Sequence, residues 1–287
     1  MHKILIAFIN YNCTDLILKA IESISESNVD YDFIVLDNAS RREEVDKLVV
    51  KFPGSALYSS VNLGFTKGLN YVINHVNKEG LVYEFLYLMN PDAISSEGLI
   101  EGLLKVLKSR KRAMVVSPKI LDQNGEVWFG GGRFDLKHLS FNKIKSDKLS
   151  ESETYNGCSA LFRWSVFQKV GLLDDDIFMY YDEAEFSHRI RSNDFEVLFD
   201  PRLSMVHYVS TTPSNFSYMK LYYMTRNVLY FTRKVLNQRG TKSRIAILRM
   251  KVIYTLSLTR KRKFEDLKYF WKGVRDFKKG RMGKIPS

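Results

Sequence analysis

The chain contains few cysteines, glycines and prolines. Cys13 and Cys158 are its two cysteines, far apart and in no Cys-x-x-Cys spacing, which excludes a disulfide framework and a cysteine-based zinc site and favours a reducing compartment. The 287 residues include 16 glycines and 6 prolines, and 45% of the residues are apolar. This composition excludes collagen-like and wholly disordered chains, and it predicts one large domain of α/β size, with or without a tail.

Long apolar runs are also absent. The first run lies within KILIAFIN and is followed by Asn-Tyr-Asn rather than by a small-residue cleavage site, so we interpret it as a strand and not as a signal peptide. No stretch approaches the roughly 18 apolar residues that a membrane span needs. We therefore expect a cytoplasmic protein, or one that is peripheral at the inner face of the plasma membrane.

Acidic residues are scarce in the last third of the chain. Residues 201–287 contain 21 Lys and Arg against three Asp and Glu, whereas residues 1–200 contain 23 against 29. The protein thus has a mildly acidic body and a strongly basic end. Such an end fits nucleic acid, anionic lipid or a phosphorylated substrate.

Strand-like and helix-like segments alternate along the first hundred residues. This alternation predicts a largely parallel sheet covered by helices on both faces. Residues 122–155 interrupt the pattern and are interpreted as a functional loop or lid. The expected strands are 3–10, 33–40, 55–60 and 84–90, and the expected helices are 14–26 (with Thr14 as its N-cap), 41–51, 67–77 and 99–108.

Glycine is missing from the turn after the first strand, which reads NYNC, and the chain has no GxxxxGKS/T sequence. A glycine-rich dinucleotide site and a P-loop are therefore excluded. Polar residues follow the expected strands instead, at Asn10, at Asp37 and at Asn90–Asp92. Ligands bind at the carboxyl ends of strands in parallel sheets, so this convergence is the first indication of a site.

Three of these polar loops have both a functional and a structural interpretation. Asp37 fits a contact to a nucleotide base or ribose, or an ordinary turn that caps the next helix. Gly64 and Gly68, in NLGFTKGLN, fit an anion-binding loop at a helix start, or merely close packing. Asp92, after Asn90 and Pro91, fits a Mg²⁺ or Mn²⁺ ligand, or a common turn.

Carboxylates gather after the aromatic run FMYY. Asp182 and Glu183 would line a pocket wall, where a carboxylate can take the proton of a hydroxyl nucleophile. For Glu185 and Arg189 we accept the alternative, an i,i+4 ion pair at a solvated helix start. His207 fits a metal or phosphate ligand, or an ordinary packed residue.

These motifs, in this order, resemble the family 2 inverting glycosyltransferases with a GT-A fold, and more narrowly the rhamnosyltransferase-like branch that builds bacterial surface polysaccharides. The resemblance covers roughly residues 3–235 and is carried by ILIAFINYN, VLDNAS, NLGFTKGLN, YLMNPDA, NGCSALFRWSVFQKVG, FMYYDEAEFSHR, His207 and YYMTRNVLYF. It implies a Rossmann-like, mostly parallel central sheet with flanking helices. Residues 1–212 would form the nucleotide-sugar-binding and catalytic domain, and residues 213–287 a basic, aromatic helical region for membrane association or an oligomer contact.

The resemblance also implies roles for individual residues. Asp92 occupies the metal-binding position of the family's DXD motif, and His207 that of a second metal-side ligand, so Mg²⁺ or Mn²⁺ is the implied cofactor. Glu183 aligns with the catalytic base. The nucleotide-sugar donor would be bound by Tyr11, Asp37, Asn62, Gly64, Gly68, Asn70, Asn90 and Arg226.

Two positions depart from the family's pattern. Asn90 replaces the first acid of DXD, which reduces the charge of the metal site. Asp182-Glu183 replaces Glu-Asp, which lengthens the base by one methylene and leaves Asp182 as the alternative base; an inactive protein is a third reading.

The implied reaction moves a sugar from dTDP-rhamnose or a UDP-sugar to a hydroxyl of a saccharide or lipid-linked saccharide, with inversion. A nucleotidyltransferase is disfavoured because the first turn lacks a glycine-rich basic loop. A nucleic-acid- or lipid-binding protein with a non-catalytic nucleotide-sugar fold is the alternative, although the acidic body argues against nucleic acid. We expect Phe270, Trp271 and Phe277 to meet the inner membrane surface, or the tail to be solvated or to make a homo-oligomer contact.

Overall fold

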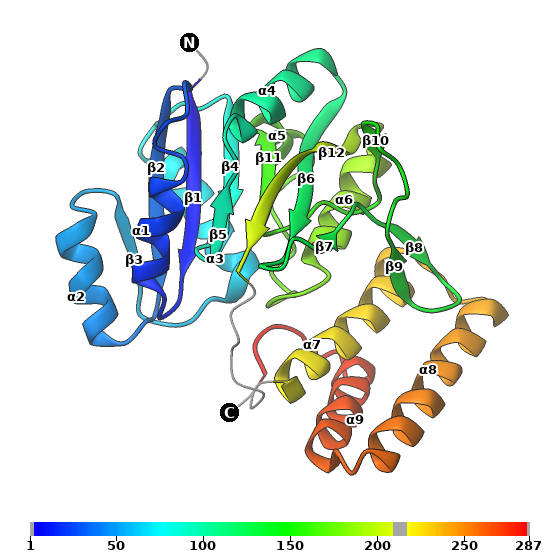
Figure 1. Ribbon diagram of the computed structural model, residues 1–287. Coiled ribbons are helices and arrows are strands. Elements are labelled where there is room, and N and C mark those ends of the chain that lie inside the picture. The colour runs from blue at the N-terminus through cyan, green and yellow to red at the C-terminus, as the bar shows by residue number, and fades with distance from the viewer. Residues whose placement is uncertain (1–2, 209–216, 286–287) are drawn as a thin grey trace.

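A ten-stranded sheet forms the centre of the structure, a computed structural model that describes residues 3–208 and 217–285 (Figure 1). The strand order is β10-β12-β6-β11-β4-β1-β2-β3, with β5 paired to β12 and β7 paired to β6. The strands are β1 Ile4–Asn10, β2 Tyr31–Asn38, β3 Ala56–Ser59, β4 Phe85–Met89, β5 Ala93–Ser95, β6 Ala113–Leu121, β7 Val127–Phe129, β10 Ser150–Glu151, β11 Ser159–Arg163 and β12 Glu196–His207.

The pairing confirms the expected mostly parallel sheet, in which β11 is an antiparallel insertion and the short strands β5, β7 and β10 also pair antiparallel. β1 is parallel to β2 and β4, β2 to β3, and β6 to β12. β11 runs antiparallel to both β4 and β6. The register places Asn10 opposite Asp37, so the polar residues that end β1 and β2 lie side by side.

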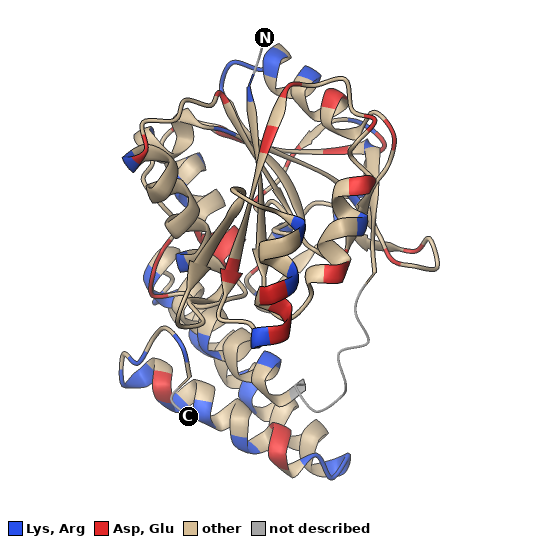
Figure 2. Ribbon diagram, turned by 90° about the vertical axis from the view of Figure 1, so that its left-hand side faces the viewer, with Lys and Arg blue, Asp and Glu red and all other residues tan. Residues whose placement is uncertain are grey.

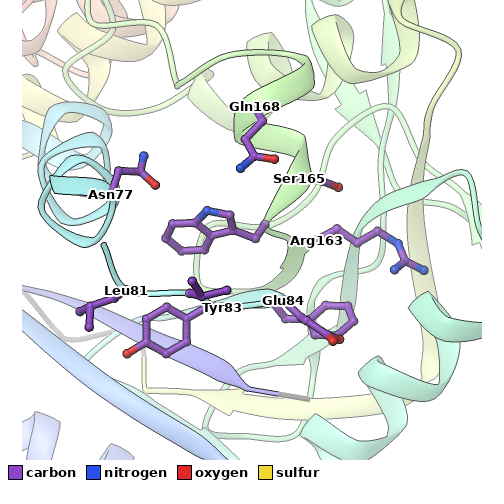
Figure 3. A pocket seen from close by; sticks show the side chains of 10 residues that line it. Asn77, Leu81, Tyr83, Glu84, Arg163, Ser165 and Gln168 are labelled. Carbon is purple, nitrogen blue, oxygen red and sulfur yellow. The ribbon is translucent and has the colours of Figure 1, made fainter. Parts of the chain in front are cut away.

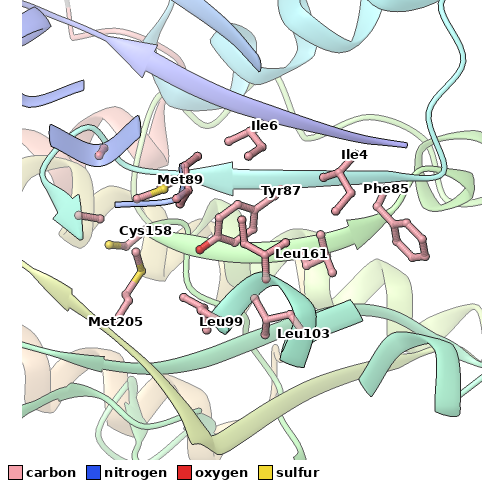
Figure 4. Packing of buried hydrophobic residues seen from close by; sticks show 14 of the residues in the cluster. Ile4, Ile6, Phe85, Tyr87, Met89, Leu99, Leu103, Cys158, Leu161 and Met205 are labelled. Carbon is pink, nitrogen blue, oxygen red and sulfur yellow. The ribbon is translucent and has the colours of Figure 1, made fainter. Parts of the chain in front are cut away.

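Helices cover both faces of the sheet because successive strand residues point to opposite sides. Ile4, Ile6 and Phe8 of β1 pack with α1 (Thr14–Glu22), α2 (Arg42–Lys51) and α4 (Leu99–Ser109). Leu5 and Ala7 pack on the other face with α3 (Gly64–Lys78), α5 (Ser165–Lys169) and α6 (Asp182–Ser192). Figure 4 shows the first of these cores, in which Met89 ends β4, Cys158 precedes β11 and Tyr87 lies in the middle of β4.

The carboxyl-terminal region is a separate helical layer. It consists of α7 (Ser217–Tyr230), a π-helical turn η2 (Phe231–Val235), α8 (Thr241–Arg260) and α9 (Phe264–Lys278). These helices form their own core together with Leu139, which follows strand β8 (Arg133–Asp135) and precedes β9 (Ser140–Asn142). Figure 2 shows that Lys and Arg crowd this layer. The expected boundary at residues 212 and 213 lies outside the described residues.

Four sequence-based expectations are corrected. Residues 122–155 are not irregular, because they contain β7, β8, β9 and β10. Thr14 is not an N-cap: Cys13 holds that position, and the Thr14 hydroxyl bonds to the Glu44 carbonyl across the α1–α2 contact. Glu185 is not solvated but 5% exposed and paired with Arg189 at 2.6 Å.

The fourth correction concerns the proposed membrane contacts on α9. Phe270 is fully buried, because it stacks on Tyr254 of α8 with ring centroids 5.2 Å apart. Phe277 is partly buried against the helical core, while Trp271 is 42% exposed. Among the helices of the described ranges, none has the length and apolar character needed to cross a membrane.

We predict that Gly64→Ala destabilises the protein more than Gly80→Ala. Both glycines have positive φ, 79° and 67°, so alanine is strained at either position. A Cβ at Gly64 would lie 2.4 Å from the Phe178 carbonyl oxygen, whereas at Gly80 it would meet no described atom within 4 Å. The free energy of unfolding in urea should fall by about 1–3 kcal/mol more for Gly64→Ala. Equal losses would contradict this packing.

Candidate active site

Polar side chains at the ends of β1 and β2 form one buried network. The Asn10 side-chain amide donates to Asp37 Oδ1 and to Thr14 Oγ1, both at 3.1 Å. Asp37 is 2% exposed, and its other oxygen accepts the Ser40 N–H at 3.1 Å. Asp37 therefore fixes the turn after β2 but does not cap α2, which begins without a side-chain cap bond. Tyr11, which follows Asn10 in the sequence, is 52% exposed.

The loop before α3 is held against this network by Asn38. Its amide donates to the Gly64 carbonyl at 3.0 Å, and its carbonyl accepts the Leu63 N–H at 2.7 Å. Asn62 accepts the Gly64 N–H at 2.9 Å. Asn38 was not among the predicted site residues, although its place directly after Asp37 at a strand end was a signal in the sequence.

Gly68 and Asn70 have structural contacts. A Cβ at Gly68 would lie 3.4 Å from both Ile9 and Leu36, so this glycine allows α3 to pack closely on β1 and β2. Asn70 is 6% exposed, donates to Leu173 and Asp175, and accepts the Leu173 N–H. The structure thus commits the Asn70 amide to residues 173–175 and leaves Gly68 in the helix interface.

Asp92 and His207 meet where β4 and β12 end. Asn90 and Ala93 close a turn through a backbone bond of 3.2 Å, and Asp92 projects from it. Asp92 Oδ1 lies 3.0 Å from Nε2 of His207, which is the last residue of β12 and pairs in register with Ala93. Trp128 packs on the imidazole with ring centroids 5.0 Å apart.

This pair suits a divalent ion whose remaining coordination positions are filled by a bound ligand. His207 is 7% exposed, and its Nδ1 has no hydrogen-bond partner in the described part of the chain. One carboxylate and one imidazole suit Mn²⁺ or Mg²⁺ when phosphate oxygens and water supply the other positions. No three His, Cys, Asp or Glu side chains of the described residues form a ready-made metal cluster.

Two adjacent carboxyl groups begin α6. Asp182 is 3% exposed, and its Oδ2 is buried with no partner among residues 3–208 and 217–285. Burial, followed by the negative charge of Glu183, raises the pKa of Asp182 well above its ordinary value. Burial also raises the pKa of Glu183, but hydrogen bonds from its own backbone, from Asp182 and from the Gly157 N–H oppose that rise. The two adjacent carboxyl groups therefore titrate as a pair, and burial disfavours a negative charge on both at once.

The Glu183 carboxylate lies against the segment that precedes β11. A Cβ on Gly157 would lie 3.0 Å from Glu183 Oε1 and 3.2 Å from the Phe65 ring. The buried Cys158 has a pKa that is raised by burial and then by the charges of Asp92 and Glu183. The Asn90 N–H donates to the Cys158 carbonyl at 3.0 Å, so residues 157–158 lie between the turn that carries Asp92 and the Glu183 carboxylate. Gly157 was not predicted as a site residue, because the need for a glycine at this position appears only once Glu183 is seen to lie against it.

The backbone before α6 is held in a conformation that bulky residues rarely adopt. Tyr180 and Tyr181 both have positive φ, 65° and 69°. Asn227 of α7 donates to the Met179 and Tyr180 carbonyls at 2.8 and 2.9 Å. The Phe178 carbonyl accepts the Phe65 N–H at 2.8 Å. We call residues 178–181 the pre-α6 segment; it is held by α3 on one side and by α7 on the other.

Arg226 does not join these residues in a shared contact. Its side chain is fully buried, with the guanidinium 5.2 Å from the ring centroids of both Tyr222 and Tyr223. Its Nη1 donates to the Tyr222 hydroxyl, which in turn donates to Asp276 of α9. Arg226 thus packs inside the helical layer, while its neighbour Asn227 reaches the pre-α6 segment.

A cavity of about 370 Å³ opens at the other end of β4, away from these groups (Figure 3). It is lined by Tyr83, Trp164, Arg163 and Gln168, among others. None of the candidate metal, donor-binding or catalytic residues selected from the sequence lines it. The candidate metal and catalytic residues lie at the other end of the sheet, near the carboxyl ends of β1, β2 and β4, and not in this cavity.

Replacing Asp182 with asparagine should reduce the loss of stability with rising pH. A folded-state pKa above the ordinary 3.8 means that the native state binds more protons than the unfolded state, so stability falls as the pH rises above that value. Asp182→Asn removes this titration. Urea unfolding at about pH 5 and about pH 8 should show a smaller loss than in the wild type. Asp147→Asn, in an exposed loop, is the control, and identical losses in all three proteins would contradict the assignment.

Comparison with known proteins identifies the family. Residues 5–171, more than half of the chain, match the profile described as Glycosyl transferase family 2. The low-salt glycan biosynthesis hexosyltransferase Agl10 of Haloferax volcanii is 26% identical over 178 residues, which are 58% of this chain and 55% of that protein. The N-acetylglucosaminyl-diphospho-decaprenol L-rhamnosyltransferase of Mycobacterium tuberculosis is 24% identical over 201 residues, which are 61% of this chain and 66% of that protein. The chain therefore spans about half to two thirds of the length of these relatives.

Solved structures show the same fold at low identity. The structure of GalNAc-T7 with UDP, GalNAc and Mn²⁺ superposes with a TM-score of 0.63 at 13% identity, covering 98% of this chain and 58% of the other. The mannosyltransferase PcManGT of Pyrobaculum calidifontis, in complex with GDP-Man and Mn²⁺, gives 0.59 at 14% identity, covering 99% and 76%. The fold is GT-A, and the chain belongs to glycosyl transferase family 2.

Proposed function

We propose that this protein is an inverting, metal-dependent glycosyltransferase that uses a nucleoside-diphosphate sugar. The observation that carries the proposal is that residues 157–158 lie against both the Asn90–Asp92 turn, which bears the Asp92–His207 pair, and the Glu183 carboxylate. One group suits a diphosphate-bound ion and the other suits a proton acceptor. Both lie at the strand ends where GT-A proteins of this family are expected to bind their donor.

The donor nucleotide would occupy the ends of β1 and β2. Tyr11 is exposed there to cover a base, and the Asn10–Asp37–Asn38 network fixes the adjoining backbone. Asn62 and Gly64 line the same edge. We propose dTDP-rhamnose or a UDP-sugar as the donor, which is in keeping with the relative named as an L-rhamnosyltransferase.

Asp92 and His207 would hold the ion, and Asn90 would contribute a neutral amide beside them. When bound, Mg²⁺ or Mn²⁺ offsets the charge that develops on the departing nucleoside diphosphate. Two solved GT-A structures contain Mn²⁺ with a nucleotide or nucleotide sugar, which supports this choice. Because Asp92 would be the one carboxylate ligand beside His207 and Asn90, the diphosphate would supply most of the negatively charged ligands of the ion.

Glu183 would act as the general base. Its carboxylate takes the proton of an acceptor hydroxyl, whose oxygen forms a bond to the anomeric carbon while the bond from that carbon to the diphosphate breaks. Attack from the face opposite the diphosphate inverts the anomeric configuration. Asp182 would keep its proton, because it is more deeply buried and lies beside the charged Glu183.

The acceptor would be a hydroxyl of a saccharide or of a lipid-diphosphate-linked saccharide in cell-surface polysaccharide synthesis. The name of the mycobacterial relative contains such a diphospho-lipid. A lipid-linked acceptor would bring this protein to the inner face of the plasma membrane. The alternative, a lipid-binding protein with a non-catalytic fold, is disfavoured by the buried Asp182 Oδ2, which has no partner among the described residues, since such a buried carboxyl oxygen destabilises a fold unless it serves a site.

Glu183→Gln should abolish sugar transfer while leaving donor affinity nearly unchanged. The amide cannot accept the proton, and loss of a general base lowers the rate by about 10²–10⁴-fold. Asp182→Asn is the matched control and should retain transfer, since Asp182 is the protonated partner. Rates with radiolabelled donor and affinities by calorimetry measure both effects. Full activity of Glu183→Gln with loss in Asp182→Asn would assign the base to Asp182.

Asp92→Ala should weaken Mn²⁺-dependent binding of a nucleoside diphosphate by at least about tenfold. Loss of a residue that only supports a metal ligand already lowers metal affinity by about tenfold or more, and Asp92 would be a ligand itself. Asn90→Asp should strengthen it, since a second carboxylate adds charge to the site. Calorimetric titrations of UDP and dTDP with Mn²⁺ or with EDTA measure this, with Asp147→Ala as the control. A manganese dependence that is unchanged in Asp92→Ala would remove Asp92 from the site.

A further inference from the structure

Helix α8 has an apolar row that faces away from its own core. Ile245, Leu248, Val252 and Leu256 recur at intervals of three and four residues, so they lie on one side of the helix. They are 60%, 63%, 48% and 66% exposed. The opposite side supplies Ala246, Ile247 and Leu258 to the helical core. Packing within the chain therefore explains one apolar side of α8 and leaves the other uncovered.

Basic residues flank this row on both sides. Residues 241–263 contain eight Lys and Arg and no Asp or Glu. At 3.6 residues per turn, Arg249 and Arg260 fall on one flank of the row and Arg244 and Lys251 on the other. Burial, and then the positive charges of Lys278 and Arg233, lower the pKa of Lys251. The surface around α8 is thus rich in cations that lie close to one another.

The apolar row and its basic flanks together distinguish among three kinds of partner: a second copy of the chain, a nucleic acid and an anionic membrane. A second copy of the chain would bring two such basic segments together, which like-charge repulsion opposes. A nucleic acid would meet the cations but would place phosphates against four exposed aliphatic side chains. An anionic bilayer accepts both parts, because acyl chains receive the apolar row while headgroups pair with the flanking Lys and Arg.

We propose that the outward face of α8, formed by Ile245, Leu248, Val252 and Leu256 with their basic flanks, lies on an anionic membrane surface. At a rise of 1.5 Å per residue, the row from Ile245 to Leu256 extends about 17 Å along the 20-residue helix. Figure 1 shows the helical layer beyond the end of the sheet to which the β1 and β4 arrows point, the same end as the candidate site. On the proposed function, this docking would bring the site to a lipid-linked acceptor. The membrane contact would then be made by α8 and not, as expected from the sequence, by Phe270 of α9.

Vesicle flotation with the full chain tests the surface. The wild type should float with vesicles of phosphatidylcholine and phosphatidylglycerol at low salt, and should bind less at high salt or to phosphatidylcholine alone. The double variant Leu248→Ser, Leu256→Ser should lower partitioning at least about tenfold, since each leucine contributes apolar burial. The control is Val50→Ser with Val82→Ser, which changes side chains that are 76% and 81% exposed elsewhere and should float like the wild type.

Three results would overturn the proposal. The wild type could fail to bind anionic vesicles, the two double variants could bind equally, or the α8 variant could change only the mass measured by light scattering, which would assign the face to a second copy. Calorimetric titration of UDP and dTDP with Mn²⁺ in the absence of vesicles keeps the tests separate. Loss of flotation with intact nucleotide binding supports the surface, and absent nucleotide binding in the wild type would count against the proposed function alone.

Discussion

The pre-α6 segment, residues 178–181, is the constraint on which the rest of the site depends. Two consecutive bulky residues with positive φ cost about 1–3 kcal/mol each, and that strain is retained only because the surroundings oppose it. Asn227 donates two hydrogen bonds to the segment, the Phe65 N–H donates a third, and Tyr223 stacks on Phe178 at 5.2 Å. At about 0.5–1.5 kcal/mol for each contact, these interactions are of the size needed to hold it. The segment ends where Asp182 and Glu183 begin α6.

On the proposed function, this arrangement would make the carboxyl-terminal helices part of the catalytic architecture. Asp276 of α9 accepts the Tyr222 hydroxyl, Tyr222 accepts from Arg226, and the neighbouring Asn227 holds the backbone that leads to Glu183. The same layer carries the exposed apolar and basic face of α8. One helical unit would therefore both orient the base and place the site near a membrane. Asp92 and His207 depend instead on the pairing of β5 with β12, which is internal to the sheet.

Sequence patterns predicted much of the sheet and part of the site. Apolar runs predicted β1, β2 and β4 because buried strands carry a strong local signal, and Asp92 and His207, both selected from the sequence, lie 3.0 Å apart. Other roles depend on contacts between distant segments. Asn70 looked like a loop ligand but bonds to residues 173–175, and Arg226 looked like a diphosphate ligand but is buried between tyrosines. Asn227 and Gly157 became visible only once their partners were placed, since neither has a local signature.

The most direct test of this account is the effect of Asn227 on turnover. Asn227→Ala, and the isosteric Asn227→Asp, which cannot donate two N–H bonds, should lower kcat by about ten- to a hundredfold through a misplaced Glu183, with donor affinity and Mn²⁺ dependence unchanged. Asn193→Ala is the matched control, because this amide bonds to the Arg189 carbonyl at the far end of α6, and it should leave kcat unaltered. A wild-type kcat in both Asn227 variants, or an equal loss in Asn193→Ala, would contradict the claim that α7 aims the base.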